Sequence, residues 1–267
     1  YKGAAYTLDK ALSGTPNDPA ATAMLSSVEL AQGNVADAEQ RARQVIAAAP
    51  KSAMGYNLLA EVALRRGQGA AALEALRKAH ELDKGPLTLT RLMRAQAQQG
   101  NLKGALESAE GWLKKSPADS VVRNALAELQ VRANDFPAAR KQYEAILKTS
   151  PTDASVLNNL ANVLIELKDP VAVDVAERAL KTDPRNPVLL DTAGWANHRN
   201  GKTDRALQLL RDARLRAPSN PDIRYHLAAV LAQTGRKAEA REELTTALRS
   251  EGFATAAEAR QLLSTLN

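Results

Sequence analysis

A regular spacing of prolines is the sequence feature that most limits how this chain can fold. Prolines lie at positions 16, 50, 117, 151, 184 and 218, at intervals of 33 or 34 residues apart from one interval of 67. The long interval equals two units, and Lys84 stands where its proline is expected. A fixed period of this length predicts a row of short supersecondary units, each of which buries its apolar face against its neighbours.

Two further residue types recur in register with the prolines. A small residue lies twelve positions before each proline, where we expect the two helices of a hairpin to touch at the short end of the usual range of about 8 to 10 Å. These residues are Ala4, Ala38, Ala72, Ala105, Ala139, Ala172, Ala206 and, in the last unit, Ala240. The turn inside each hairpin is predicted at residues that tolerate the left-handed backbone conformation. They are Gly33, Gly67, Gly100, Asn134, Gly201 and Gly235.

The composition favours helices and excludes several kinds of site. Hydrophobic residues make up 45% of the chain and aromatic residues only 3%, so the apolar mass is mainly Ala and Leu, which are strong helix formers. The sequence contains no Cys, which excludes disulfides, thiolate zinc sites and cysteine nucleophiles. The formal charge of +6 is mild for this length, and no run approaches the roughly 20 apolar residues of a transmembrane helix. We therefore expect an all-α chain with no transmembrane segment and no nucleic-acid partner.

Units with this period, these small residues and these turns resemble tetratricopeptide repeats, and the resemblance covers nearly the whole chain. It implies a right-handed α-solenoid, a superhelix of about seven helix-turn-helix units, with a leading half repeat at 1–18 and a C-terminal capping helix at 255–267. The seven units lie at 19–52, 53–85, 86–119, 120–153, 154–186, 187–220 and 221–254. The fifth unit is one residue short near Lys168, so we expect a tighter turn or an earlier second helix there. Because the half repeat lacks its first helix, we also expect the native sequence to continue upstream of Tyr1.

The resemblance further implies that the first helix of each unit lines a concave groove, where we expect a protein or peptide to bind. An Asn side chain both donates and accepts hydrogen bonds and can bind the backbone of an extended peptide, while Trp195 and Tyr225 are candidate anchors for a partner side chain. Two alternatives remain open: the Asn side chains are simply solvated, and Trp195 packs between hairpins as core. The predicted partner-binding residues are Asn57, Arg94, Asn124, Glu128, Asn158, Asn159, Asn162, Asp191, Trp195, Arg199 and Tyr225. The same register places Glu61, Arg65, Arg91, His198 and His226 on this face.

No arrangement of residues predicts catalysis, a cofactor or a metal ion. Residues 201–203 resemble the end of a phosphate-binding loop, but Ala196 stands where that motif needs Gly, and no strand is predicted before it. His80, His198 and His226 lack the spacing of metal ligands. We therefore predict that the protein is not an enzyme and that it has no catalytic, cofactor-binding or metal-binding residues.

Three segments carry a narrower resemblance. Residues 191–196, residues 221–227 and the tail from Gly252 are similar to the C-terminal region of long bacterial tetratricopeptide lipoproteins that accompany PEP-CTERM and exosortase sorting systems and exopolysaccharide production. This resemblance implies a scaffold in the periplasm or anchored to the outer membrane of a Gram-negative bacterium, with the cytoplasm as the alternative. Two other functions stay open: a regulatory repeat domain of a larger enzyme such as a glycosyltransferase, and a scaffold that self-associates through its exposed repeat ends.

Overall fold

The computed structural model describes residues 2–15, 18–250 and 252–266. Pro16, the first proline of the period, lies outside these residues together with Asn17 and Glu251. Tyr1 and Asn267, the outer ends of the two predicted flanking segments, lie outside them as well. The described residues form helices and no strand, which confirms the all-α prediction.

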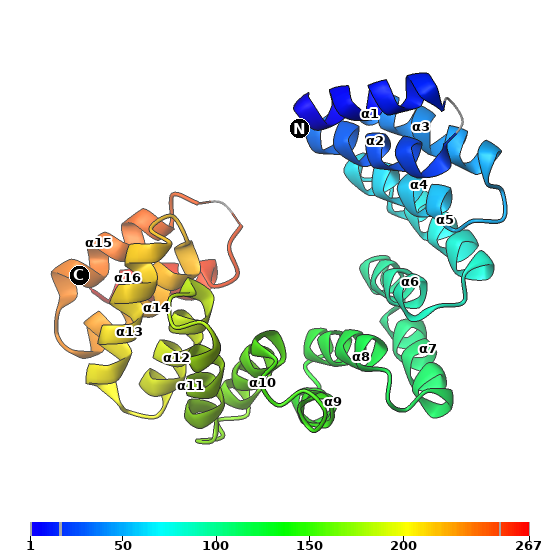
Figure 1. The fold of residues 1–267 in the computed structure, drawn as a ribbon. Helices are drawn as coiled ribbons and strands as arrows, with labels where there is room; N and C mark the ends of the chain where they lie inside the picture. The colour runs from blue at the N-terminus through cyan, green and yellow to red at the C-terminus, as the bar shows by residue number, and fades with distance from the viewer. Residues whose placement is uncertain (1, 16–17, 251, 267) are drawn as a thin grey trace. The chain divides into compact units, whose positions relative to one another are not determined.

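Sixteen helices follow one another along the described residues (Figure 1). They are α1 (Lys2–Gly14), α2 (Pro19–Gln32), α3 (Val35–Ala48), α4 (Met54–Arg65), α5 (Gly69–Leu82), α6 (Pro86–Gln98), α7 (Leu102–Lys115), α8 (Ser120–Arg132), α9 (Phe136–Leu147), α10 (Ala154–Glu166), α11 (Ala172–Thr182), α12 (Pro187–Arg199), α13 (Thr203–Arg216), α14 (Pro221–Gln233), α15 (Lys237–Ala247) and α16 (Ala256–Thr265). Within the part of the chain that the structure describes, no helix combines the length and the apolar content needed to cross a membrane.

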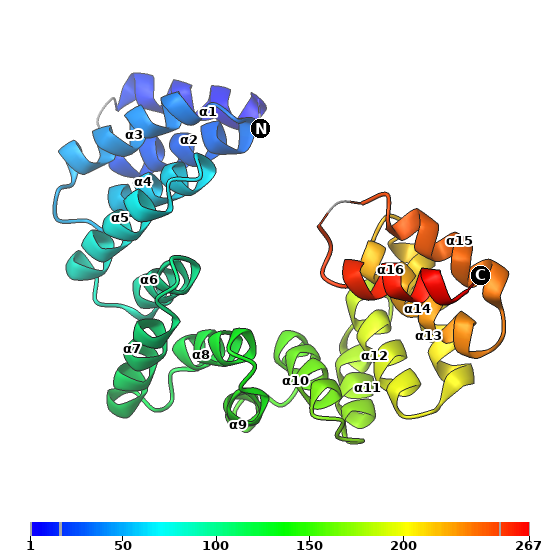
Figure 2. The same ribbon diagram turned by 180° about the vertical axis from the view of Figure 1, so that it is seen from behind.

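The chain divides into two compact units, Tyr1–Ala133 (unit 1) and Asn134–Asn267 (unit 2). In unit 1 the pairs α2/α3, α4/α5 and α6/α7 form hairpins that pack on one another, and in unit 2 the pairs α10/α11, α12/α13 and α14/α15 do the same (Figure 1, Figure 2). Such layering of helix pairs is the arrangement of an α-solenoid. We call α2, α4, α6, α8, α10, α12 and α14 the first helices, and α3, α5, α7, α9, α11, α13 and α15 the second helices. Because α8 and α9 belong to different units, the division into seven repeats stays a prediction.

The recurring alanines lie where the prediction places helix contacts. On the second helices they are fully buried: Ala38, Ala72, Ala105, Ala139, Ala172, Ala206 and Ala240. The contact is close enough for Ser26 Oγ on α2 to donate a hydrogen bond to the Ala38 carbonyl on α3, at 2.9 Å. Ala4 on α1 is exposed. The small residue is therefore buried on each second helix and exposed on α1.

The turns inside the hairpins have the predicted backbone conformation. All six predicted turn residues have positive φ, from 59° at Asn134 to 86° at Gly33. Side-chain caps begin several first helices: Asp153 Oδ1, for example, accepts hydrogen bonds from the amides of Ser155 and Val156 at 3.0 and 3.1 Å. Left-handed residues that end one helix and caps that begin the next keep the connections short.

In the fifth hairpin the second helix does not begin earlier, so that alternative of the prediction is wrong, whereas the bonds before α11 agree with the alternative of a tighter turn. Lys168 adopts the left-handed conformation with φ 55°, and α11 begins only at Ala172, so it has 11 residues where α3 has 14. The reason lies in the missing residue, because the buried Ala172 follows Lys168 by four positions, whereas Ala38 follows Gly33 by five. The segment before α11 is held by bonds of the 3₁₀ type, from Ala172 N to Asp169 O at 3.1 Å and from Val173 N to Pro170 O at 3.3 Å.

Candidate functional site

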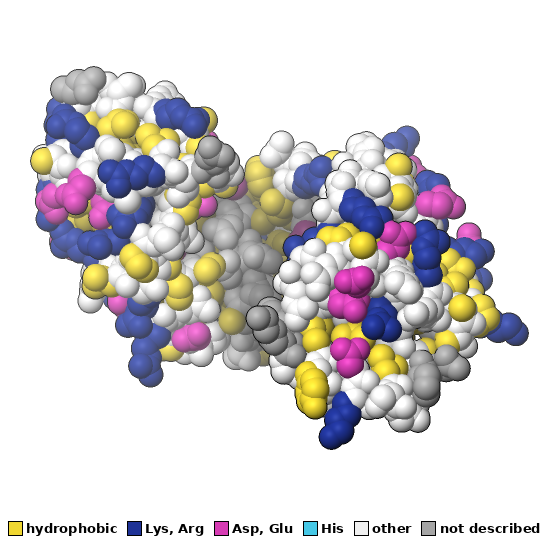
Figure 3. All heavy atoms as spheres, turned by 90° about the horizontal axis from the view of Figure 1, so that it is seen from above, with side chains coloured by type: hydrophobic (Ala, Val, Ile, Leu, Met, Phe, Trp, Pro, Cys, Tyr) yellow, Lys and Arg dark blue, Asp and Glu magenta, His cyan; other side chains and the backbone are white. Residues whose placement is uncertain are grey.

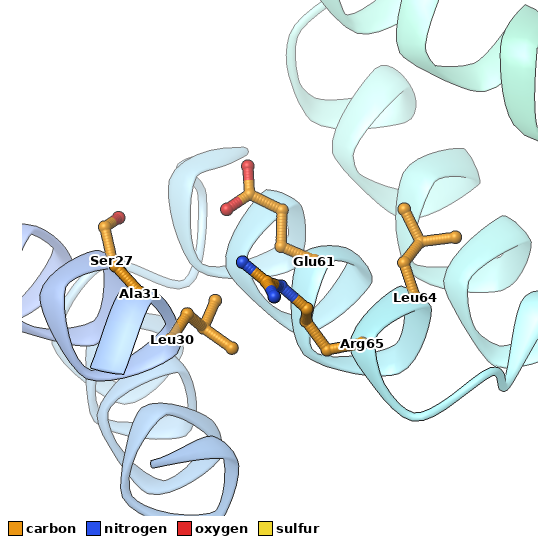
Figure 4. Close-up of a pocket in the computed structure, with 6 residues that line it drawn as sticks. All are labelled: Ser27, Leu30, Ala31, Glu61, Leu64 and Arg65. Atoms are coloured by element: carbon orange, nitrogen blue, oxygen red, sulfur yellow. The ribbon is translucent and has the colours of Figure 1, made fainter. Parts of the chain in front are cut away.

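The first-helix face of unit 1 contains two adjoining hollows. The α2–α4 hollow has a volume of about 390 Å³ and is shown in Figure 4; it is lined by Ser27, Leu30, Ala31, Glu61, Leu64 and Arg65. The α4–α6 hollow has a volume of about 220 Å³ and is lined by Asn57, Ala60, Glu61, Leu64, Leu76, Arg91, Arg94, Ala95 and Gln98. Because Glu61 and Leu64 line both, the hollows form one surface, which we call the unit 1 groove.

Asn57 leaves a buried hydrogen-bond acceptor in this groove. Its Nδ2 donates to the Ala53 carbonyl one helical turn earlier, at 3.0 Å, which fixes the direction of the side-chain amide. Its Oδ1 is buried and accepts no hydrogen bond from any described residue. An acceptor left in this state costs about 1–3 kcal/mol relative to a satisfied one. Because this oxygen has almost no exposed surface, a donor from outside the chain cannot reach it unless neighbouring side chains move.

Ion pairs connect successive first helices along the same face. Arg94 Nη2 on α6 lies 2.8 Å from Glu128 Oε2 on α8, and Asn124 Nδ2 donates to the other carboxylate oxygen, Oε1, also at 2.8 Å. Arg91 on α6 lies 4.0 Å from Glu61 on α4, at the outer limit of an ion pair. The structure thus brings together Arg94, Asn124 and Glu128, three residues that the sequence predicted for partner binding.

Large exposed hydrophobic side chains are concentrated on the first helices. Among the described residues, six of the nine such side chains lie there, with exposed fractions from 41% to 65%, and a single one, Leu215, lies on a second helix. The six are Met24, Met54, Leu64, Leu87, Val121 and Val188. These six side chains are absent from the predicted partner-binding residues, all of which are polar or aromatic. Four of them recur at the start of a first helix, at positions 54, 87, 121 and 188, and this periodicity was a usable signal.

In unit 2 the predicted aromatic residues form a cluster that joins α12 to α14. The ring centroids of Trp195 and His226 are 4.3 Å apart, with the ring planes 19° apart, and the centroid of His198 lies 4.9 Å from that of Trp195. The Tyr225 ring lies 6.1 Å from Trp195, and the Arg199 guanidinium carbon lies 6.0 Å from the Trp195 ring centroid. Trp195 is half-buried, so it packs between hairpins and offers a partner only part of its surface.

Burial and charge set the protonation of this cluster. Asp191 Oδ1 lies 2.8 Å from His226 Nδ1, which connects α12 to α14 beside the rings. Burial lowers the pKa of His198 below its usual value, and the nearby Arg199 and His226 act in the same direction. His198 Nδ1 is buried and has no hydrogen-bond partner among the described residues. The arrangement therefore holds His198 neutral at pH 7.

The three asparagines of α10 do not form one polar row. Asn158 is 9% exposed and its Oδ1 has no partner among the described residues, whereas Asn159 is half-buried and Asn162 is exposed. An Asn that is mostly buried contributes to the packing of the hairpins as much as to a surface. Only Asn162 presents most of its amide to solvent.

Metal binding and polyanion binding both require particular clusters of charged side chains. Over the residues that the structure describes, no three His, Asp or Glu side chains are placed to hold a metal ion. Basic side chains on the second helices have acidic neighbours, such as Glu74 beside Arg77 at 3.5 Å and Glu81 beside Lys78 at 2.9 Å. Basic and acidic side chains also alternate over the face drawn in Figure 3. Such mixed charge is poorly suited to a phosphate backbone.

Comparison with solved structures shows relatives of the same fold. A chain of the APC/C hetero-tetramer Cut9-Hcn1 is 14% identical with a TM-score of 0.71, over 97% of this chain and 51% of that chain, so this chain spans about half its length. A tetratricopeptide repeat protein from Parabacteroides merdae ATCC 43184 is 15% identical with a TM-score of 0.69, over 90% and 95%. YrrB, described as a TPR protein with an unusual peptide-binding site, is 20% identical with a TM-score of 0.52, over 71% and 100%.

None of the curated proteins compared with this chain matches it significantly. Two family models, each described as tetratricopeptide repeat, do match: one over residues 96–162 and 198–266, the other over residues 23–86. These ranges cover well over half of the chain and include first and second helices of both units. The chain, with its buried alanines, left-handed turns and layered hairpins, belongs to the tetratricopeptide repeat family.

Proposed function

We propose that this chain is a non-catalytic scaffold that binds a segment of a partner protein on its first-helix face. Tetratricopeptide folds are typical of protein–protein interaction scaffolds. The observation that supports the proposal most directly is the concentration of exposed hydrophobic side chains on the first helices, because apolar surface gathered on one set of elements is typical of interaction sites. YrrB, which has the same fold, is described as having a peptide-binding site, and this supports a binding role for the present chain.

The proposed contact residues fall into one set on each unit. In unit 1 they are Asn57, Arg94, Asn124 and Glu128, together with the exposed leucines Leu64 and Leu87. In unit 2 they are Asn158, Asn159, Asn162, Asp191, Trp195, Arg199 and Tyr225. The polar members supply directional hydrogen bonds, while the leucines supply apolar area.

We further propose that the scaffold acts in the bacterial envelope, in protein sorting or exopolysaccharide assembly, as a periplasmic or outer-membrane-anchored protein. The support is the similarity of residues 191–196 and 221–227 to lipoproteins of PEP-CTERM systems. A cytoplasmic location, a repeat domain within a larger enzyme and a self-associating scaffold are the competing proposals. Sedimentation of the purified chain over a range of concentrations distinguishes self-association from a monomeric adaptor.

Selection from a displayed random peptide library, followed by affinity measurement on synthetic copies of the enriched peptides, tests the binding function. Two variants, Leu64→Gln and Leu87→Gln, remove apolar area from the first-helix face without adding charge. The control is Leu215→Gln on the second helix α13, because Leu215 is 68% exposed and Leu87 is 65% exposed. Circular dichroism verifies that all three variants keep the helicity of the wild type.

We expect the first-helix variants to weaken binding about fivefold, because the exposed half of a leucine contributes about 1 kcal/mol when a partner covers it. The control variant should bind as the wild type does. If the enriched peptides bind all variants equally, or lose affinity only for Leu215→Gln, the first-helix face is not the binding surface.

A further inference from the structure

We propose that the contact between α12 and α14 is a proton-sensitive joint, which opens under mild acid when His198 takes up a proton and thereby exposes Trp195. We call the contact made by Trp195, His198 and His226 the α12–α14 joint. The proposal goes beyond the proposed binding function and does not depend on it. It follows from three features of the joint: rings that cover Trp195, a buried imidazole nitrogen without a hydrogen-bond partner, and a second histidine that has an acidic partner.

Side chains rather than a turn connect α12 to α14, because the two helices belong to successive hairpins. The His226 ring reaches across from α14 and stacks on the Trp195 ring, with the centroids 4.3 Å apart. His198, on the same helix as Trp195, places its ring centroid 4.9 Å from that of Trp195. The Trp195 ring is therefore covered from both helices, and its exposure depends on where the two imidazole rings lie.

The closed joint has no acceptor for a proton on His198. An imidazolium carries an N–H on both ring nitrogens, whereas neutral imidazole carries only one. His198 Nδ1 is buried and has no hydrogen-bond partner among the described residues. Protonated His198 would therefore bury an N–H donor without an acceptor, which disfavours the charged ring in this position.

The charges around His198 also oppose a further proton. Burial lowers the pKa of His198, and the positive charges of Arg199 on α12 and His226 on α14 lower it further. Of the helices packed against α12, which are α10, α11, α13 and α14, only α14 contributes a described charged group that acts on His198. Other charged and titratable groups lie around the joint without acting on His198: Asp191, bonded to His226; Glu258 of α16, which acts on Tyr225; and Lys168 and Asp169, which line a hollow with Arg199. Among the described residues, no carboxylate therefore offsets a charge on His198.

His226 responds to a proton in the opposite way. Its Nδ1 lies 2.8 Å from Asp191 Oδ1 and 3.0 Å from Asp191 Oδ2. Because Asp191 belongs to α12, protonated His226 forms an ion pair that connects the two helices, and the Asp191 and His226 side chains are only 15% and 14% exposed. A proton on His226 thus stabilises the joint and places a positive charge beside His198, whereas a proton on His198 destabilises the joint.

The size of the response follows from the two states of His198. In the open joint its ring lies in water and binds a proton near the ordinary pKa of about 6.5, whereas the closed joint lowers that pKa. Because the open state binds the proton first, acid shifts the equilibrium toward the open state. The equilibrium constant for opening should rise by up to about tenfold for each unit of pH below about 6.5, until the closed state also binds the proton.

The test follows the exposure of Trp195 in the intact, folded chain between about pH 7 and pH 5. The variant Trp112→Phe leaves Trp195 as the sole tryptophan, and Trp195→Phe leaves Trp112 as a reporter on α7 of unit 1. Quenching of fluorescence by acrylamide measures the exposure of each tryptophan. Hydrogen exchange, corrected for the intrinsic effect of pH on the exchange rate, measures the opening of α12 and α14. Circular dichroism verifies that the chain stays folded over this range.

Two variants and a control, each made together with Trp112→Phe, identify the group that takes up the proton. His198→Gln removes the titrating ring, and Arg199→Gln removes one of the charges that lower its pKa. His80→Gln on α5 is the control, because His80 is also half-buried and its Nδ1 has a partner, Thr88 Oγ1, at 3.0 Å.

We expect quenching of Trp195 to increase as pH falls from about 7 to about 5, while quenching of Trp112 stays constant. His198→Gln should remove the increase, and His80→Gln should leave it unchanged. Arg199→Gln should make the increase smaller, because it brings the pKa of His198 in the closed joint nearer to that in the open joint. In the wild type, hydrogen exchange should show the opening constant of α12 and α14 rising by up to about tenfold per unit of pH.

Several outcomes would overturn the proposal. Constant exposure of Trp195 over this range would mean that the joint stays closed, and an increase that persists in His198→Gln would assign the proton to another group. An equal increase at Trp112 would indicate a general loosening of the chain rather than the opening of one joint. Should His198→Gln expose Trp195 already at pH 7, Arg199→Gln decides the question, since an undiminished increase in that variant contradicts the role of His198.

Discussion

Replacing Gly194 with alanine should destabilise unit 2, although the same replacement stabilises an ordinary helix. Gly194 lies inside α12 and faces α13, where an added Cβ would lie 2.6 Å from Leu210 Cγ and 3.0 Å from Leu210 Cδ2. Leu210 is fully buried, so its side chain has little free space into which it can move. Either the Leu210 side chain leaves its preferred rotamer or α12 and α13 move apart.

The expected magnitude follows from two opposing effects. In an open helix interior, exchange of Gly for Ala stabilises by about 0.5–1 kcal/mol, because the unfolded chain loses conformational freedom. Overpacking a filled contact costs about 1–3 kcal/mol. The net loss of unfolding free energy for Gly194→Ala is therefore about 1 kcal/mol, within limits of about 0 and 2.5 kcal/mol. Gly111 on α7 is the matched control, because no heavy atom lies within 4 Å of its added Cβ and only the gain remains.

Urea unfolding measured by circular dichroism and tryptophan fluorescence is the assay. Trp195 follows Gly194 and Trp112 follows Gly111, so each variant has a fluorescent reporter on its own helix. Gly194→Ala should lower the midpoint of unfolding and Gly111→Ala should raise it. A midpoint for Gly194→Ala at or above that of the wild type would refute the argument that a small residue is needed where α12 meets α13.

Two further predictions concern pH. Asp153→Ala should lower the unfolding free energy by about 1 kcal/mol at pH 7, because the hydroxyl of Ser155 and the amides of Ser155 and Val156 all donate to Asp153. Since these bonds hold the pKa of Asp153 below its usual value, the stabilisation should begin to decrease as pH falls below about 4, and urea unfolding should show a smaller difference between variant and wild type at pH 3 than at pH 7. Burial lowers the pKa of His198, so as pH falls below about 6.5 the unfolded chain binds a proton at this residue before the folded chain does. The unfolding free energy of the wild type should therefore decrease between about pH 7 and pH 5. His198→Gln should make this decrease smaller. Equal slopes of unfolding free energy against pH for His198→Gln and the wild type would contradict this assignment.

The fold was predictable because its main contacts are local and repeated. A helix pair in close contact requires a small residue at the crossing, and a short turn requires a residue with positive φ. The same residue types therefore recur at the same positions of successive units. Lys168 shows where this reasoning ends. Lysine rarely adopts positive φ, yet Lys168 does so at 55°, because it occupies the turn position that Gly or Asn occupies in the other hairpins.

The sequence predicts which residues of the candidate site lie on the first helices, but it does not predict which of their side chains contact one another. The repeat register identifies which residues lie on the first helices, and Arg94, Asn124 and Glu128 were found in this way. Their hydrogen bonds depend on how α6 and α8 pack, which no pattern in the sequence reports. The same holds for Trp195: its place on α12 was predicted, but the stacking of His226 on its ring depends on the packing of α12 against α14.

The exposed hydrophobic residues at the starts of the first helices have no evident role in folding. Met54, Leu87, Val121 and Val188 keep 41% to 65% of their surface exposed, so they contribute little to the core. Ser155 and Asp222 occupy the same register on α10 and α14, and those helices form equally well, so the position does not require an apolar side chain. A leucine at such a position lowers the solubility of the protein and does not stabilise the helix pair. Contact with another molecule, as proposed for the first helices, would account for the apolar residues at this register.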